Sequence, residues 1–544
     1  MDLCESDAVD RQGEESFKAA PILRRGETCW RIARADRFAL IVDAADYFAA
    51  ARSAMLKAEH SIPLVGWDFD LRIDLLPEGR EGGQEDGYPT RLGDFLKAIV
   101  RRKPWLRIFI LKWDMAVLYT LGNQMLPVFA LDLMSVERIK MRFDSTHPWM
   151  SAHHQKIVVI DDALAFCGGI DMTTDRWDTR RHLPGDERRR RPDGSLHGPW
   201  HDATTVVDGA AAGLLGKLVR ERWRFATGRS LKGGKGTADL WPDAIRPQLR
   251  DVDVAVARTM PAYEGRAAVR EIEELYLAAI RSAKRWIYLE SQYFASVSIC
   301  DAIAGRLAEP GGPEVVVINP LSQDGWLEQV TMGTARSLRL ASVAAADRHD
   351  RFAIFHPVDE AGDPIYVHAK ILIVDDELLR VGSSNVNNRS LGFDTECDLA
   401  VEAGMAQERS AIAAMRNDLL AEHLDVDATT VAAAIERCCS LLGAVEALRR
   451  PAGRSLRPLP RRPVNDAEEI LARSHLADPE RPKDLEGRLE HIAKRLVLRV
   501  PPSAWLALSA AGLAAISAVL LHRRGRRRRH EAAGRRRHET ARRW

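Results

Sequence analysis

Two stretches of the sequence, "HHQKIVVIDD" (His153 to Asp162) and "YVHAKILIVDD" (Tyr366 to Asp376), decide the fold. Each reads histidine, one residue, lysine, four residues, aspartate, and each is rich in the aliphatic residues of a buried strand. Side chains alternate along a strand, so the histidine and lysine of each stretch share one face. Asp161 and Asp375 stand an odd number of positions from their histidines. We expect them to point elsewhere or to close the strand.

The repeated spacing indicates an internal duplication. His154 and His368 are 214 residues apart, and the strand-like segments that begin at Ile62 and Ile287 are offset by a similar 225. Short apolar strands alternate with helical patterns in both halves. We therefore predict two similar α/β sandwich lobes related by a pseudo-twofold axis, each with a mostly buried central sheet flanked by helices, and a C-terminal apolar helix.

The predicted domain organisation follows from this duplication and from shifts in composition. We expect an N-terminal extension (1–34), a first lobe (35–245), a second lobe (246–447), an arginine- and proline-rich linker with a short helix (448–500), and an apolar segment with a basic tail (501–544).

Composition indicates a globular, intracellular protein. Of the 544 residues, 46% are hydrophobic and 29% charged, which is an ordinary balance. The seven cysteines lack metal-site spacing and disulfide density, which favours a reducing compartment. The acidic, polar start has no basic head or apolar core, so we expect no cleaved export signal.

The C-terminal end suggests membrane association. Residues 505–521 carry no charge and would span about 25 Å as a helix, which is short for a crossing. Eleven arginines and two glutamates follow in residues 522–544. A buried core helix is the alternative for the apolar segment. The basic tail favours the cytoplasmic face of the inner membrane, with a crossing as a second possibility, and it could attract anionic lipid or nucleic acid.

Small and polar residues recur at a fixed distance after each motif. Gly168-Gly169 and Gly382-Ser383 both begin 14 residues after the histidine, and Asp171 and Asn385 follow three places on. Small residues let a ligand approach the backbone closely. We predict that Gly169, Ser383 and Asn385 contact a substrate phosphate.

The sequence closely resembles the phospholipase D superfamily, which is defined by two HxKxxxxD motifs meeting across a pseudo-twofold axis. The resemblance extends to "GGIDMTTDRWDT", "PWHDATTVVDG", "IYLESQYF" and "NVNNRSLGFDTECDLAVE" and covers about residues 35–430, most like bacterial relatives of the eukaryotic-type enzymes. One departure is Asp171, where many members have asparagine, which puts its role as a substrate ligand in doubt.

The residue types suit a phosphodiester. Lys156 and Lys370 would hold its non-bridging oxygens, a task that metal ions perform elsewhere. No metal-ligand cluster accompanies the motifs, so we expect neither a metal nor another cofactor. The resemblance implies that His154 is the nucleophile and His368 the general acid, although near-symmetry leaves the reverse assignment open.

The resemblance also implies orienting carboxylates. Asp202 would orient His154, and Glu396 would orient His368. We include Asp161 and Asp375 with the catalytic motif residues, although the alternation argument favours a structural anchoring role for both.

Three aromatic residues have two interpretations. Trp67, Trp177 and Tyr293 either line a lipid entrance or pack in the core.

The predicted function is a phospholipase D that forms phosphatidate and a headgroup alcohol through a phosphohistidine, with transfer to other alcohols as a side activity. A phosphatidyltransferase of the cardiolipin synthase type is the alternative. A nuclease and a non-catalytic membrane binder are less favoured. We expect a phospholipid substrate and a membrane surface as partners, no nucleic acid, and catalysis by a monomer, because one chain carries both motifs.

Overall fold

The computed structural model describes residues 20–77, 86–114, 136–234, 236–323, 332–460 and 478–480. The described residues belong to one compact unit that ends at Pro482. The predicted C-terminal helix and basic tail, and most of the predicted N-terminal extension, lie outside them. No helix in these ranges has the length and apolar character needed to cross a membrane. The predicted domain boundaries stay predictions.

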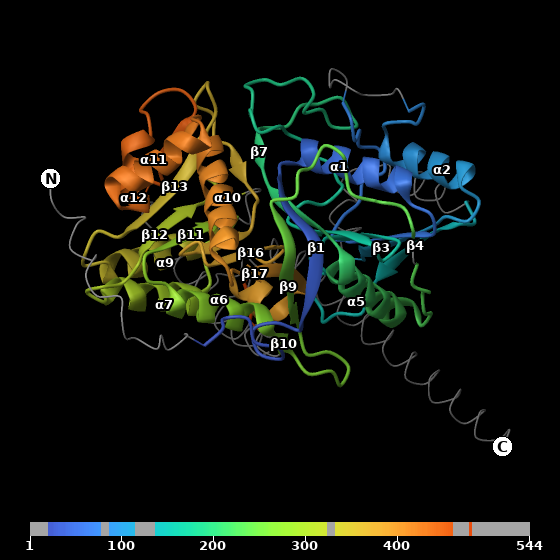
Figure 1. Ribbon diagram of the computed structural model, residues 1–544, viewed down its shortest axis with the longest axis horizontal. Coiled ribbons are helices and arrows are strands. Elements are labelled where there is room, and N and C mark those ends of the chain that lie inside the picture. The colour runs from blue at the N-terminus through green and yellow to red at the C-terminus, as the bar shows by residue number, and fades with distance from the viewer. Residues whose placement is uncertain are drawn as a thin grey trace, which may run out of the picture. The chain divides into compact units, whose positions relative to one another are not determined.

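The first half follows the chain from β1 to α5. Its elements are β1 (Arg31–Val42), α1 (Ala44–Lys57), β2 (Ser61–Gly66), α2 (Leu92–Arg102), β3 (Arg107–Trp113), β4 (Ile139–Asp144), β5 (Ile157–Ile160), β6 (Leu164–Gly168), β7 (Trp200–His201), β8 (Ala203–Asp208) and α5 (Gly209–Thr227). Helices lie on both sides of its strands (Figure 1).

The second half repeats this order and adds a C-terminal cover. Its elements are β9 (Leu249–Met260), β10 (Val269–Arg270), α6 (Glu271–Ser282), β11 (Trp286–Glu290), α7 (Val297–Ala308), β12 (Glu314–Ile318), α9 (Thr334–Ala346), β13 (Phe352–Val358), β14 (Tyr366–Val367), β15 (Ile371–Val374), β16 (Leu378–Gly382), a π-helix (Arg389–Phe393), β17 (Glu396–Glu402), α10 (Ala406–Leu424), α11 (Ala428–Cys438), α12 (Leu441–Leu448) and β18 (Ser455–Pro458).

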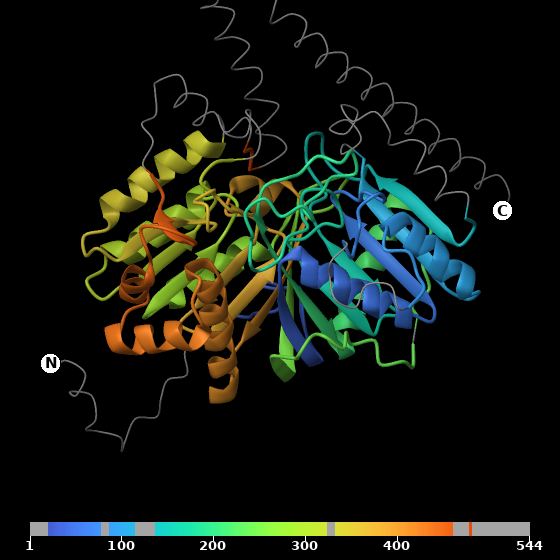
Figure 2. The ribbon, with the colours of Figure 1, turned by 90° about the horizontal axis from the view of Figure 1, so that it is seen from above.

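The strands of both halves form one mixed sheet. Its order is β18-β13-β12-β11-β15-β16-β17-β9-β1-β8-β6-β5-β2-β3-β4, with β10 paired to β9. Apart from β18, the order reads the same outward from the β9–β1 junction in each direction, as a duplication requires. The predicted α/β class with strands flanked by helices is confirmed. The two predicted sheets are halves of one sheet, and Figure 2 shows the halves side by side.

Strand alternation explains how the sheet is covered. In β2, Ile62 and Leu64 pack with α1 and α2, whereas Val65 faces the core that contains α5 and α10. The helices α6 and α7 cover the corresponding face in the second half. Burying each such side chain contributes about 1.5–3 kcal/mol, so both faces hold the motif strands in place.

A second, smaller pairing joins the halves beside the motifs. β7 pairs with β14 in parallel, with Trp200 opposite Tyr366 and His201 opposite Val367. The equivalent contact on the other side is a parallel bridge between His153 and Thr395. Each histidine motif therefore begins next to backbone from the opposite half.

The two motif aspartates anchor the start of a neighbouring strand. Asp161 accepts hydrogen bonds from the backbone N–H groups of residues 59–61, at 2.6, 2.8 and 2.6 Å. Asp375 does the same for residues 284–286, at 2.6, 2.8 and 2.9 Å. The anchoring role favoured by strand alternation is confirmed. Grouping these residues with the catalytic set is wrong, because a four-residue strand of about 13 Å separates each from its lysine.

The two halves differ in what covers one face of their outer strands. In β4, Lys140 and Arg142 occupy the sheet positions that Ala353 and Phe355 occupy in β13. Phe355 lies in the core that α11 and α12 complete, and α12 contacts β12. The equivalent face of the first half carries an open groove instead, with a volume of about 970 Å³.

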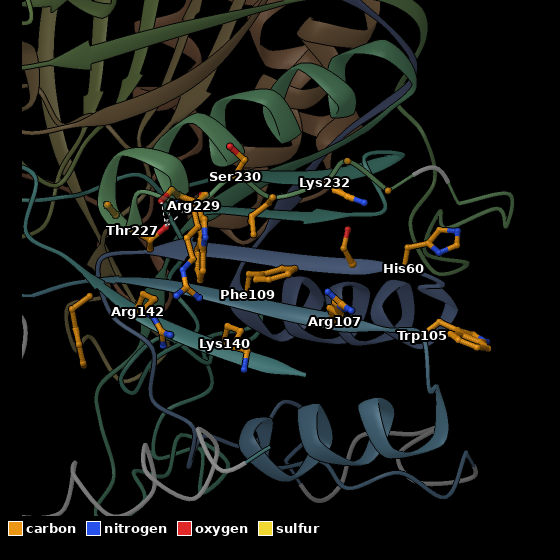
Figure 3. A pocket seen from close by; sticks show the side chains of 17 residues that line it. His60, Trp105, Arg107, Phe109, Lys140, Arg142, Thr227, Arg229, Ser230 and Lys232 are labelled. Carbon is orange, nitrogen blue, oxygen red and sulfur yellow. Dashed lines mark hydrogen bonds between the residues drawn. The ribbon is translucent and has the colours of Figure 1, made fainter. Parts of the chain in front are cut away.

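The groove is basic and partly aromatic. Figure 3 shows Arg107 and Phe109 from β3, and Lys140 and Arg142 from β4, along its floor. Its exposed cations are Arg107, Lys140, Arg142, Arg229 and Lys232. Within the described ranges, no carboxylate forms an ion pair with any of the five. Trp105, at one end, is 81% exposed.

Replacing Asp161 with alanine tests the anchor. The change removes the acceptor of three backbone N–H groups, and we expect a loss of about 2–4 kcal/mol in the free energy of unfolding, measured by denaturant titration. Asp253→Ala is the control, because that side chain is 68% exposed, and it should change stability by less than about 0.5 kcal/mol. Equal effects of the two changes would contradict the anchoring role.

Candidate active site

Each motif histidine is held by a carboxylate of the opposite half. His154 Nδ1 lies 3.0 Å from both oxygens of Glu396. His368 Nδ1 lies 2.6 Å from Asp202 Oδ2. Backbone bonds fix the same arrangement, since His154 N donates to Thr395 O at 2.9 Å and His368 N donates to His201 O at 2.8 Å. A carboxylate at Nδ1 keeps the other ring nitrogen, Nε2, available for chemistry.

This geometry corrects the predicted partners. Asp202 holds His368, not His154, and Glu396 holds His154, not His368. The choice of these two carboxylates is correct and their assignment is wrong. The parallel contacts between the halves place each carboxylate beside the other half's motif, which the linear sequence does not reveal.

Each motif lysine is hydrogen-bonded to the backbone of its own motif histidine. Lys156 Nζ donates to His154 O at 3.0 Å, and Lys370 Nζ donates to His368 O. Lys156 also pairs with Asp171 at 3.0 Å. For Lys370, the structure records no carboxylate within ion-pair distance among the described residues. The two cations therefore differ in how far their charge is balanced.

The charges of both motifs act on the pKa of each motif histidine. Burial, together with Lys156 and Lys370, lowers the pKa of His154 well below its usual value. Burial, with Lys370, Arg176, Lys156 and His154, does the same to the pKa of His368. Residues of both motifs thus act on each histidine, so the structure brings His154, Lys156, His368 and Lys370 together.

The buried lysine of the second motif has a lowered pKa. Burial, together with the charge of Lys156, lowers the pKa of Lys370 to about 7 against the opposing effect of Asp202. Burial also raises the pKa of Glu396 and of Asp202. Burial thus favours the neutral forms of all three groups, and an anion bound between the lysines would favour the charged form of Lys370.

Two of the predicted phosphate ligands have other tasks. The N–H of Gly169 already donates to Ala203 O at 2.8 Å, and a Cβ there would lie 2.3 Å from Asp202 Oδ1. Glycine is therefore needed so that Asp202 can approach, and its role as a phosphate ligand stays a prediction. Ser383 Oγ donates to Glu396, and its N–H donates to Asp398 at 3.0 Å. Ser383 thus supports the carboxylate of Glu396, and its contact with a phosphate stays a prediction.

Asn385 remains suited to a polar ligand. Its side chain is buried, its Nδ2 lies 3.4 Å from Gln292 Oε1, and its Oδ1 has no partner among the described residues. Asp171, at the equivalent position of the first half, accepts from Trp67 N at 3.0 Å as well as pairing with Lys156. Its internal ion pair agrees with the doubt about Asp171 as a substrate ligand.

Sequence reasoning missed the clamp on Asp202. The N–H of Asp43 donates to Asp202 O at 2.7 Å, and Asp202 N donates to Asp43 Oδ1 at 3.1 Å. Asp43 holds φ 65° and ψ 153°, a region that non-glycine residues rarely adopt and that costs about 1–3 kcal/mol. Nothing in the local sequence pattern signals this contact, because Asp43 and Asp202 are distant in the chain.

A buried network of histidines and carboxylates stands behind Asp202. His201 Nδ1 lies 2.7 Å from Glu422, and its Nε2 lies 2.8 Å from Glu290. Burial disfavours the charged ring, yet Glu290 and Glu422 raise the pKa of His201 well above its usual value. Burial also disfavours the charged ring of His182, yet Asp43 and neighbouring carboxylates raise its pKa to about 9. Two imidazolium ions thus offset the carboxylates.

The same network contains the residue types of a metal site. Donor atoms of Asp43, His182, His201 and Glu422 gather within 4.8 Å of one another. The ion pairs among them already account for their charges, and they lie behind Asp202 rather than against the reacting groups.

A different network stands behind Glu396. Arg222 donates to Thr395 Oγ1 at 2.9 Å and to Asp144 at 2.7 Å. Burial, with Arg222, lowers the pKa of His153 to about 3. The central cation of the network behind Glu396 is thus an arginine, whereas the network behind Asp202 contains protonated histidines.

The aromatic predictions divide between the core and the surface. Trp177 is buried in the first-half core, which favours its packing interpretation. Trp67 is half-buried and stacks on Trp113, with ring centroids 5.9 Å apart. Tyr293 is half-buried, and its hydroxyl accepts from Gln292 at 3.2 Å. The entrance role stays a prediction for Trp67 and Tyr293.

Comparisons with known proteins find similar sequences. A family model described as cardiolipin synthase, PLD-like domain, matches residues 276–415. Phospholipase D A of Dictyostelium discoideum is 24% identical over 430 residues, covering 66% of this chain and 32% of that protein. Phospholipase D alpha 2 of Oryza sativa subsp. japonica is 25% identical over 503 residues, covering 64% and 59%. The chain thus spans between one third and three fifths of these two relatives.

A solved structure is also similar. The crystal structure of phosphatidylserine synthase from Haemophilus influenzae Rd KW20 covers 71% of this chain and 87% of its own, at 12% identity and a TM-score of 0.48. The two histidine–lysine motifs lie on one duplicated sheet, and the sequence matches identify the class of protein that has this arrangement. The chain belongs to the phospholipase D superfamily.

The state of Lys370 gives a test by calorimetry. With a pKa of about 7, much of Lys370 is neutral at pH 8. A bound phosphodiester anion raises this pKa, so binding at pH 8 should take up protons, whereas binding at pH 5.5 should take up few at this group. Titrating dimethyl phosphate in buffers of different ionisation enthalpy measures the uptake.

Lys370→Met serves as the variant for this titration. It should remove most of the uptake at pH 8. An unchanged uptake in this variant, or proton release by the wild type, would contradict the assignment.

Proposed function

We propose that this protein is a phospholipase D, which hydrolyses a glycerophospholipid to phosphatidate and a free headgroup alcohol. The observation that supports this most directly is the pair of imidazoles, His154 and His368, each held at Nδ1 by a carboxylate and both within the field of two lysines. Such a site can attack a phosphorus atom from one side and protonate a leaving oxygen on the other.

The proposed reaction has two steps. His154 Nε2 attacks phosphorus, the bond to the headgroup oxygen breaks, and His368 gives its proton to that oxygen. Water then attacks the phosphohistidine while His368 takes a proton from it, which releases phosphatidate and restores His154. Lys156 and Lys370 stabilise the charge on the non-bridging oxygens in both steps. An alcohol in place of water gives transfer.

The lowered pKa of His154 suits its proposed role as nucleophile, because a neutral ring is required. His368 must be protonated in the first step. The negative charge of the bound phosphodiester, added to that of Asp202, would raise its pKa and allow this.

A phosphatidyltransferase of the cardiolipin synthase type is the second candidate. The family model that matches residues 276–415 carries that description. The same two steps serve it, with a lipid alcohol as the acceptor in place of water.

One assay separates these functions. Purified protein is incubated in chelator with phosphatidylcholine, phosphatidylethanolamine and phosphatidylglycerol vesicles, with and without ethanol, and products are resolved by mass. A phospholipase D forms phosphatidate, and phosphatidylethanol when ethanol is present. A phosphatidyltransferase of the cardiolipin synthase type forms cardiolipin and glycerol from two molecules of phosphatidylglycerol. Cleavage of single-stranded DNA with no lipid product would contradict both.

Replacing the histidines tests the assignment of roles. His154→Ala should abolish the covalent intermediate and lower turnover by about 10³-fold or more, as measured by phosphate label on acid-quenched protein. His368→Ala should slow turnover while His154 still becomes labelled by substrates with good leaving groups. Label found on His368 in the wild type would reverse the assignment.

We also propose that a membrane surface is a partner, at the cytoplasmic face. The basic groove supports this, because exposed cations next to an exposed tryptophan suit the headgroup layer of an anionic bilayer. The apolar segment and arginine tail predicted from the sequence would act with it.

Vesicle sedimentation tests the groove. The triple change Arg107→Gln, Lys140→Gln and Arg142→Gln should weaken binding to phosphatidylglycerol vesicles by about 100-fold, at about 1 kcal/mol per cation. Three exposed cations elsewhere, Arg281, Lys284 and Arg348, provide the matched triple control. Equal losses for the two triples would mean that the groove has no particular role.

A further inference from the structure

A third cation stands beside His368. Arg176 follows the first motif in a loop, and its guanidinium lies 4.4 Å from the centre of the Trp200 ring. That ring in turn packs against Tyr366, at 4.5 Å, and His368, at 5.3 Å, between centroids. Arg176 also contributes to the lowered pKa of His368 and of Lys370. The stack therefore forms one wall of the site on the His368 side.

The charge of Arg176 has no carboxylate partner among the described residues. Its Nη1 donates only to the carbonyls of its own loop, Thr174 O at 3.5 Å and Asp175 O at 3.2 Å. Its Nε is buried without a hydrogen-bond partner in this part of the chain. The adjacent carboxylate of Asp175 pairs with Arg191 at 2.6 Å.

Two nearby cations show that this loop and this site can satisfy such charges. Arg188, in the same loop, lies 5.1 Å from the centre of the Trp177 ring but pairs with Asp186 at 2.6 Å. Lys156 pairs with Asp171 at 3.0 Å. Arg176 is half-buried and is left without an equivalent partner.

Unsatisfied polar atoms gather around the same stack. The indole Nε1 of Trp200 and the Oδ1 of Asn385 have no partner among the described residues, although both side chains are more than nine-tenths buried. Buried polar atoms of this kind normally have a partner. The guanidinium and the indole N–H are donors, which suit an oxygen anion, whereas Asn385 Oδ1 is an acceptor, which suits a donor group on the same ligand.

We infer that Arg176 binds a second anionic group, carried by the substrate's headgroup. One phosphodiester brings a single negative charge to the site, and Lys156 and Lys370 already face it. This inference rests on the proposed function, in which His368 protonates the headgroup oxygen, so a cation beside His368 lies on the headgroup side. The substrate class is then a phospholipid whose headgroup bears a carboxylate or a further phosphate.

The same arrangement disfavours a choline headgroup. A quaternary ammonium ion needs a free aromatic face, and the Trp200 ring already contacts Arg176, Tyr366 and His368. An unpaired guanidinium would also repel the cation.

Phosphatidylserine and phosphatidylethanolamine provide a matched test, because they differ only by the headgroup carboxylate. Each is offered to the full-length chain at low mole fraction in neutral detergent micelles, so that surface charge does not contribute. The wild type should favour phosphatidylserine by about tenfold in kcat/KM. Arg176→Gln should remove that preference mainly by raising the KM for phosphatidylserine, and Arg176→Lys should restore part of it.

Arg188→Gln is the matched control, because it removes a guanidinium that stacks on tryptophan but is already paired. It should leave the ratio between the two substrates unchanged. A wild-type ratio near one, or equal losses on both substrates in Arg176→Gln, would overturn the inference.

A binding measurement separates this inference from the proposed reaction. Glycerophosphoserine should bind the wild type more tightly than glycerophosphoethanolamine in calorimetry, and Arg176→Gln should abolish the difference. Differential binding without turnover of any phospholipid would count against the proposed function alone. Turnover without differential binding would count against Arg176 alone.

Discussion

The site depends on two short backbone contacts between the halves. His154 N donates to Thr395 O, and His368 N donates to His201 O. These bonds place each motif histidine directly beside the residue that precedes the opposite half's carboxylate. Neither half can complete its own histidine–carboxylate pair, so the two pairs form together when β1 and β9 join the halves into one sheet. Duplication in one chain makes this contact intramolecular, which avoids the entropic cost of assembling two subunits.

The same geometry explains why a core strand carries a histidine and a lysine. Burying an ammonium group without a counter-ion is costly, and the two halves deal with this differently. Lys156 has an internal partner in Asp171, whereas burial lowers the pKa of Lys370 to about 7. The second half is thus prepared for an anion that the protein itself does not supply. Donors fixed in place before the substrate arrives are the usual source of transition-state stabilisation.

Much of this could be predicted from the sequence, because it follows from local periodicity. The repeated motif indicated a duplicated α/β fold, and the odd spacing of Asp161 and Asp375 indicated that they serve the backbone. The resemblance to the phospholipase D superfamily, rather than periodicity, selected Asp202 and Glu396 as the orienting carboxylates. The partners of these carboxylates could not be predicted, because they depend on which strands meet between the halves. Asp43 and the His201 network were missed for the same reason, and Gly169 proved to make room for Asp202.

Each histidine is held by the carboxylate of the opposite half, and the NMR signals of the histidine ring nitrogens report on this pairing. In protein labelled with ¹⁵N-histidine, Glu396→Gln should shift the ring nitrogens of His154 and leave those of His368 nearly unchanged, while Asp202→Asn should do the reverse. Signals are assigned with His154→Gln and His368→Gln. If Glu396→Gln instead shifts the ring signals of His368, and Asp202→Asn shifts those of His154, then each half orients its own histidine. That result would contradict the crossed pairing.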